Sequence, residues 1–132
     1  MLKEIWRDLV GNGALPCRED VWEISRLGVD PDLPGDARRR VLGELLCAGA
    51  EFGFAKDFRE FLFVTSPALI AIVARNSGLA VDVLGAPRPL AHFKVAAARL
   101  TVTEEALEKT RRAFGIVGGV LRFPEPCEAL AA

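Results

Sequence analysis

The sequence predicts a layered α/β domain, and three observations support this prediction. The chain has 132 residues, a length that fits one domain. Hydrophobic residues make up 51% and charged residues 27%, a composition that can fill a core and argues against intrinsic disorder. Apolar stretches of strand length alternate with longer stretches of helical period, as in βαβ units. We therefore expect a sheet whose first strands pair in parallel and whose faces are covered by helices.

Composition also excludes several classes of protein. The net charge of −1 argues against a basic nucleic-acid-binding arm, so no nucleic-acid partner is expected. The longest apolar run, residues 68–74, is far shorter than the ~20 residues that span a bilayer, and no signal peptide is visible. The cysteines Cys17, Cys47 and Cys127 lie far apart, and His92 is the single histidine. These features predict a cytoplasmic protein with reduced thiols, no membrane insertion and no metal site.

The first half of the chain predicts two helices around one strand. Residues 2–10 carry apolar side chains at helical spacing, and residues 21–29 form an apolar stretch that ends at Asp30-Pro31. Asp36 is the expected N-cap of a helix that runs to Lys56. The apolar face of that helix is expected to contain Val41, Leu42, Leu45, Leu46, Gly49 and Phe52.

In the second half, residues 60–65 predict a short strand buried on both faces. Ser66 followed by proline predicts the start of a helix over residues 67–77, which Gly78 is expected to end in a left-handed conformation. Strands are predicted at residues 79–84 and 94–102 with the loop 85–89 between them, and Thr103 is the expected cap of the last helix.

Two charged residues interrupt the apolar stretch 21–29. On a strand, Glu23, Ser25 and Leu27 share one face, whereas Arg26 lies on the other. Glu and Arg are rarely buried unless they are paired, so this stretch requires partners or a water-filled cleft. The alternative is an edge strand on which charges merely discourage aggregation.

Three stretches of the sequence carry a resemblance to a known family. Residues 22–30 read WEISRLGVD, residues 63–69 read FVTSPAL, and the chain opens MLKEIW. They resemble, in the same order, the WE-x-SRF-x-VD, VTS-x-AM and ML-x-D-x-F stretches of acyl-homoserine-lactone synthases, the autoinducer synthases of the LuxI type. The resemblance covers nearly the whole chain, taken as one domain over 1–132. It implies a three-layer fold like that of Gcn5-related N-acetyltransferases (GNAT), with a central mixed sheet.

The chain departs from the family pattern in two ways. Family members continue upstream of the ML stretch through an N-terminal third, with the first strands of the sheet and positions that grip S-adenosylmethionine. We therefore expect an N-terminally truncated version of the fold. Leu27 also stands where the family usually has Phe, in the wall of the substrate cleft.

The resemblance implies a reaction and roles for individual residues. Family members transfer an acyl chain from acyl carrier protein to the amine of S-adenosylmethionine, and lactonisation then releases methylthioadenosine. Both molecules are substrates, so no cofactor is expected. By resemblance, Glu23 acts as general base through a water held by Ser25, and Arg26 holds the fold or a substrate carboxyl group.

The same resemblance places the acyl group against the second motif. Val64, Thr65 and Ser66 are expected to line the acyl pocket, although Ser66 is equally expected to cap its helix. Leu27 and Trp6 are expected to contact substrate, with Trp6 touching the acyl tail. The aromatic and aliphatic side chains nearby are more often ordinary core than pocket wall.

Three consecutive arginines, Arg38, Arg39 and Arg40, occupy the first turn of the predicted helix, where the helix dipole disfavours cations. One interpretation is an anion site for pantetheine phosphate or for an acidic carrier protein. The other is a solvated face with an Arg40–Glu44 ion pair, and the sequence does not separate the two.

A second hypothesis is a non-catalytic remnant that binds acyl carrier protein or a partner chain. It follows from the expected truncation, which would leave one edge of the strand at 21–29 unpaired. An apolar edge of this kind is expected to associate, including with a second copy of the chain.

Overall fold

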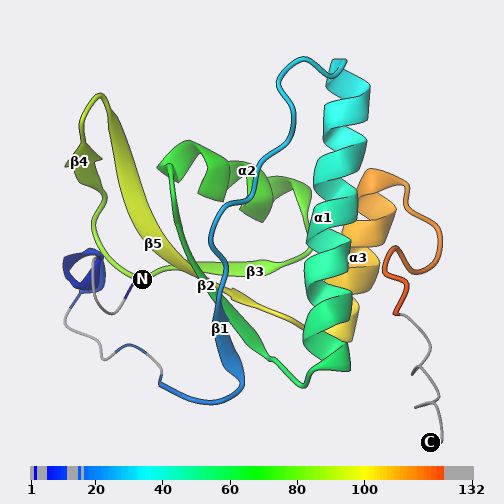
Figure 1. Cartoon of the computed structure of the whole chain (residues 1–132), viewed down its shortest axis with the longest axis horizontal. Coiled ribbons are helices and arrows are strands. Elements are labelled where there is room, and N and C mark those ends of the chain that lie inside the picture. The colour runs from blue at the N-terminus through cyan, green and yellow to red at the C-terminus, as the bar shows by residue number, and fades with distance from the viewer. Residues whose placement is uncertain (1, 3–5, 12–14, 16, 124–132) are drawn as a thin grey trace, which may run out of the picture.

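A computed structural model describes residues 2, 6–11, 15 and 17–123 of the chain (Figure 1). Three α-helices and five strands are assigned in these residues, together with one 3₁₀ turn at Arg7–Leu9. The strands are β1 (Val21–Glu23), β2 (Glu60–Thr65), β3 (Ala80–Val83), β4 (Arg88–Leu90) and β5 (Phe93–Thr101). The helices are α1 (Gly35–Ala55), α2 (Pro67–Asn76) and α3 (Glu104–Phe114).

The described strands form one mixed sheet in the order β1-β2-β5-β3, and β4 pairs with β5 as a hairpin. β1 and β2 are parallel neighbours joined by α1, with Val21 opposite Glu60 and Glu23 opposite Leu62. All the other described pairings are antiparallel. The expected α/β class with a mixed sheet and a parallel start is therefore confirmed.

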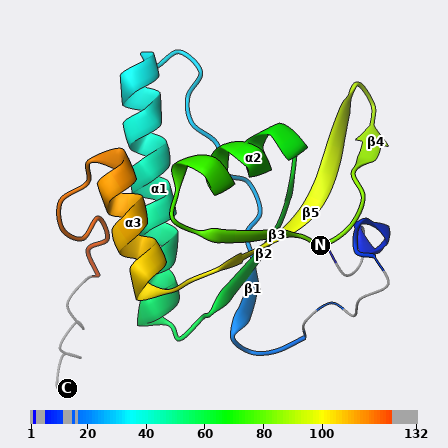
Figure 2. The same ribbon diagram turned by 180° about the vertical axis from the view of Figure 1, so that it is seen from behind.

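The helices cover one face of the sheet (Figures 1 and 2). Cys47 and Ala50 of α1, Val73 of α2 and Leu107 of α3 meet the sheet residue Phe61 in one buried cluster. Cys47 is fully buried, which confirms its expected role as a small core residue. This cluster joins all three helices to the same side of β2 and β5.

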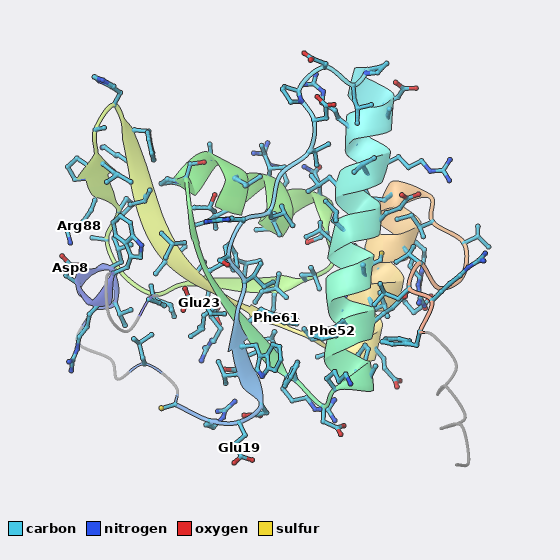
Figure 3. The ribbon with its side chains drawn as sticks, viewed as in Figure 1. Asp8, Glu19, Glu23, Phe52, Phe61 and Arg88 are labelled. Carbon is cyan, nitrogen blue, oxygen red and sulfur yellow. The ribbon has the colours of Figure 1, made fainter. Side chains whose placement is uncertain are left out.

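The N-terminal segment covers the opposite face. Leu2 and Leu9 are fully buried against Leu62, Val95 and Ala97, whose side chains point away from the helices. Two polar contacts fix the segment to the far end of the sheet: the Gly11 amide donates to the Leu84 carbonyl at 2.9 Å, and Asp8 forms an ion pair with Arg88 (Figure 3).

The structure corrects two of the expected elements. Within residues 2–10, the described part is helical only in the turn Arg7–Leu9. The strand expected at 21–29 ends at Glu23, because Arg26 adopts a left-handed backbone conformation with φ of 64°. A left-handed residue departs from the extended conformation of a regular strand. Ser25 and Leu27 consequently do not continue the strand face that Glu23 begins.

The helix ends agree only in part with expectation. Ser66 and Thr103 cap α2 and α3 as predicted, accepting the amides of Leu69 and Ala106. Asp36, however, lies inside the first turn of α1, and the N-cap position belongs to Pro34. The carboxylate therefore acts on the helix dipole instead of capping an amide.

Gly78 does not end α2 in the left-handed conformation that was predicted, because the C-cap is Ser77 in an extended conformation. The glycine has a different purpose. A Cβ at Gly78 would lie 2.0 Å from the Cβ of Lys109 on α3. Gly78 thus permits the close approach of α3.

Two further expectations about local structure were wrong. The predicted loop 85–89 contains the start of β4, and Ala91 with φ of 50° helps to turn the chain into β5. On α1, the fully buried positions are Gly43, Cys47, Ala50 and Gly53, so the buried face is displaced from the predicted one and is built from small residues. Small residues allow α1 to approach the sheet and α3 closely.

Glu51 fastens the segment after α3 to the helix layer. Its carboxylate accepts the backbone amides of Val120 and Leu121 at 2.8–3.1 Å and the guanidinium of Arg111 at 2.8 Å. Burial acts to raise the pKa of Glu51, but the Leu121 amide, Arg111 and the Val120 amide together hold that pKa below its ordinary value. The carboxylate is therefore an anchor in its charged form.

Candidate functional site

The candidate site begins where two parallel strands separate. The Ile24 amide donates to the Leu62 carbonyl at 2.8 Å, and this is the last backbone contact between β1 and β2. Beyond it, the left-handed Arg26 turns the chain away from β2 towards the start of α1. Crevices at the carboxyl ends of parallel strands are common binding sites in α/β proteins.

A cavity of about 180 Å³ opens in this crevice. Four of the residues predicted to contact substrate line it, namely Arg26, Leu27, Val64 and Thr65. The remaining wall is apolar and comes from α1, α2, β2, β5 and the residue after β1: Ile24, Leu46, Phe63, Leu69, Val73 and Leu100. The exposed fraction is 38% at Leu27 but only 5% at Val73 and 7% at Leu100. The cavity therefore has a polar mouth at Arg26 and a closed apolar end in the core.

The backbone of Val64 faces the gap between the two strands. Backbone groups of alternate residues point to the same side of a strand. Glu60 and Leu62 use theirs towards β1, as the bonds Glu60 N to Asp20 O and Ile24 N to Leu62 O show. Val64 follows in this alternation, but the β1–β2 register ends at Leu62. Within the described residues, the Val64 amide thus has no strand partner on that side.

Leu27 and Leu69 also border an outer groove of about 430 Å³, which leads from the cavity to the first turn of α1. Arg38 and Arg39 line this groove. The Arg39 guanidinium also contacts α3: it donates to the Ala113 carbonyl at 2.8 Å and lies 4.8 Å from the centre of the Phe114 ring. The groove therefore has a cationic outer end.

Arg40 does not line this groove. Its guanidinium pairs with Glu44 at 2.9 Å on the exposed side of α1. The expected Arg40–Glu44 ion pair is therefore present, and Arg40 lines, with Arg39, a second groove between α1 and the segment after α3.

Glu23 lies on the sheet face opposite the helices. Figure 3 shows its side chain turned towards the N-terminal segment, whereas Phe61 and Phe52 lie on the side of α1. Its carboxylate is half-buried and accepts the Leu2 amide at 3.1 Å and 3.0 Å. The neighbouring Trp22 packs on the other face, with its ring centre 3.8 Å from that of Phe58. Glu23 and the cavity thus share the end of β1 but occupy different faces.

Three further predicted residues do not line the cavity. Ser25 is exposed just beyond β1, and Ser66 caps α2. Trp6 packs with Leu2 and Leu9 on the N-terminal face, away from the apolar cavity that was expected to hold the acyl tail.

Sequence reasoning missed the closed end of the cavity. Leu46, Val73 and Leu100 come from α1, α2 and β5, and their spacing indicated only burial. Phe63 and Leu69, which begin and end the second motif, also line the cavity. No signal in a single sequence shows that the side chains of Leu46, Val73 and Leu100 leave a space between them.

Titratable and metal-binding groups add little to this site. Burial raises the pKa of the Cys47 thiol, which disfavours the reactive thiolate. Across the described ranges, no three His, Cys, Asp or Glu side chains gather closely enough to hold a metal ion. His92 and Cys17 are exposed, and Cys127 lies outside the described residues.

None of the helices in the described part has the length and apolarity needed to span a membrane.

The parallel β1-α1-β2 unit and the mixed sheet define a domain with a GNAT-like fold. Within this fold class, residues 1–110 match the model of the autoinducer synthase family. The chain therefore belongs to the autoinducer synthase family, as its WEISR and VTS motifs predicted.

Solved structures agree with this assignment. The CoA-dependent acyl-homoserine lactone synthase MesI is 28% identical over 90% of this chain and 58% of its own, with a TM-score of 0.78. BjaI, another CoA-dependent acyl-homoserine lactone synthase, is 21% identical over 89% of this chain and 54% of its own, with a TM-score of 0.76. The synthase LasI is 24% identical over 94% of this chain and 60% of its own, with a TM-score of 0.68.

The chain spans only 54–60% of the length of these three proteins. A search among curated proteins gave no significant match.

Proposed function

We propose that this chain carries out acyl-homoserine-lactone synthesis, with the acyl group in the cavity and Glu23 as the general base. The observation that carries the proposal is the position of the two features. The apolar cavity and the Glu23 carboxylate lie on either side of the sheet at the point where β1 separates from β2. Two substrates can therefore approach from opposite faces and meet in the gap between the strands.

The first step joins the two substrates. The amine of S-adenosylmethionine is protonated at neutral pH and must lose a proton before it attacks. A carboxylate has about four acceptor sites, so Glu23 can still accept this proton, directly or through one water, while it holds the Leu2 amide. The nitrogen then bonds to the thioester carbon, the carbon–sulfur bond breaks, and the thiol leaves with a proton.

The Val64 amide is the donor best placed to stabilise the oxyanion of that step. It faces the gap and borders the cavity mouth. Preorganised backbone amides of this kind contribute strongly to acyl transfer.

In the second step, the methionine carboxylate attacks the carbon next to the sulfonium, a carbon–oxygen bond closes the lactone, and methylthioadenosine leaves.

The acyl donor in this proposal is a phosphopantetheine thioester, carried by acyl carrier protein or by coenzyme A. The groove at Arg38 and the first turn of α1 offers positive charge to a phosphate on that arm. We expected acyl carrier protein from the family resemblance. MesI and BjaI, by contrast, are CoA-dependent enzymes, so both carriers need to be compared.

A binding-only role is the second candidate. Glu23 does not line the cavity, and its carboxylate already accepts the Leu2 amide. A unit that holds the acyl carrier or a partner chain without turnover would fit these two observations.

Release of methylthioadenosine tests the proposal. The 132-residue chain is incubated with S-adenosylmethionine and either hexanoyl-CoA or hexanoyl carrier protein, and the product is measured by chromatography. Release with either donor supports synthesis and identifies the carrier. Saturable binding of a donor without release of product would reject synthesis and support the binding-only role.

A further inference from the structure

The closed end of the cavity bears on a property that the family assignment leaves open, which is the length of the acyl chain. Val73 and Leu100 form this end, and both belong to the main core cluster. Ala106 and Leu107 of α3 belong to the same buried cluster. The cavity therefore has no continuation into the core, and its depth is set by well-packed side chains.

The polar end is fixed as well. The Val64 amide, Thr65 and Arg26 provide the polar groups at the mouth, so a thioester carbonyl has its partners there. An alkyl tail attached to that carbonyl must extend inwards, between Leu46 of α1 and Leu69 of α2.

The volume then limits the tail. An apolar cavity of about 150 Å³ accommodates benzene, which has six carbons. By the same measure, a cavity of about 180 Å³ holds roughly six carbon-sized groups. A tail of ten or more carbons would have to leave through the mouth or force Val73 and Leu100 apart, and close-packed cores resist such expansion.

We propose that this site selects short acyl chains of about four to six carbons and that Val73 sets the limit. The choice of an acyl thioester as ligand rests on the proposed function, whereas the length limit rests on the cavity alone. Each methylene buried up to the limit is expected to tighten binding by about fourfold, and further carbons are expected to give no gain.

Two ligand series test this limit on the full chain. The first contains acyl-CoA thioesters from butyryl to dodecanoyl, and the second contains straight-chain alcohols of the same lengths, which do not depend on acyl transfer. Dissociation constants come from calorimetry or from ligand-induced shifts in methyl NMR spectra. In both series the affinity should rise to about six carbons and then level off or fall.

Variants at position 73 move the limit in opposite directions. Val73→Ala should extend the preferred length by one or two carbons, and Val73→Leu should shorten it by about as much. Val81→Ala is the matched control, because Val81 packs against the same core cluster without lining the cavity. Its preferred length should equal that of the wild type.

The outcomes separate this inference from the proposed function. A limit seen with alcohols but not with acyl-CoA would retain the cavity limit for apolar ligands and reject the acyl donor. Affinity that keeps rising beyond ten carbons, a preferred length that is unchanged in both Val73 variants, or no binding of any alcohol would overturn the inference.

Discussion

Both carboxylate oxygens of Glu23 accept a hydrogen bond from the backbone amide of Leu2, at 3.1 Å and 3.0 Å. This contact joins the N-terminal segment to the last residue of β1, on the face opposite the helices. It explains how a charged residue is tolerated beside the buried side chains of Leu2 and Leu62. It also fixes the carboxylate at the point where the strands separate, which the proposed chemistry requires.

Substitution of Glu23 by glutamine should remove the base and leave the fold intact. The Glu23→Gln side chain keeps an oxygen that can accept the Leu2 amide, but it takes up protons very weakly. Methylthioadenosine release should fall by about 10²–10⁴-fold. Binding of hexanoyl-CoA should change less than threefold, because the residue does not line the cavity.

Glu19→Gln provides the control for that experiment, since Glu19 is exposed just before β1. Its rate of release should match the wild type. An equal loss of activity in both variants, or full activity in Glu23→Gln, would remove Glu23 from the mechanism.

Two glycines of α1 should respond to alanine in opposite ways. A Cβ at Gly43 would lie 2.4 Å from the Phe114 side chain, whereas a Cβ at Gly49 would meet nothing within 4 Å. Gly43→Ala should lower the free energy of unfolding by roughly 1–3 kcal/mol. Gly49→Ala should raise it by about 0.5–1 kcal/mol, because alanine favours the helix. Urea denaturation of both variants measures the difference, and effects of the same sign would refute the α1–α3 packing.

The Glu51 anchor should make a measurable contribution to stability. Glu51→Gln removes the charge that Arg111 and the two backbone amides stabilise, which should cost about 1.5–3 kcal/mol. Glu44→Gln alters only an exposed pair with Arg40, so its cost should stay below about 0.5 kcal/mol. Comparable losses in the two variants, again from urea denaturation, would contradict the anchoring role.

The same anchor predicts a pH dependence. The pKa of Glu51 is lower in the folded chain than in the unfolded chain, so its contribution is complete above the ordinary glutamate value of about 4.3. The contribution is lost as the pH falls through the lower, folded pKa. The stability difference between the wild type and Glu51→Gln should therefore be constant from pH 7 to 5 and shrink below about pH 4. A difference that grows on acidification would have the wrong sign.

Much of the fold could be predicted because its signals are local. The caps at Ser66 and Thr103 and the apolar strand at Glu60–Thr65 depend on neighbouring residues, and all three were found where expected. Gly78 shows the limit of such reasoning. Its position after α2 suggested a helix end, but the contact that requires glycine comes from Lys109, thirty-one residues later.

Only part of the site could be predicted, because the rest depends on contacts between residues that are distant in the sequence. The two motifs contain Arg26, Leu27, Val64 and Thr65, which the fold brings to one cavity. Glu23 is separated from that cavity because alternate residues of β1 face opposite sides of the sheet. Leu27 does not follow this alternation because Arg26 adopts a left-handed conformation, which is uncommon for arginine and carries no local sequence signal. Trp6 lies apart from that cavity, because the N-terminal segment covers the opposite face of the sheet, and only the folded chain shows this.

Intermolecular NOEs test the central claim, that the crevice between β1 and β2 holds the acyl group, most directly. The methyl-labelled chain is saturated with hexanoyl-CoA, and contacts from the terminal methyl of the ligand are assigned. We predict NOEs to the methyl groups of Leu69, Val73 and Leu100, together with a shift of the Val64 amide resonance. NOEs confined to Val95 and Leu62 on the opposite face, or none at saturation, would contradict the account.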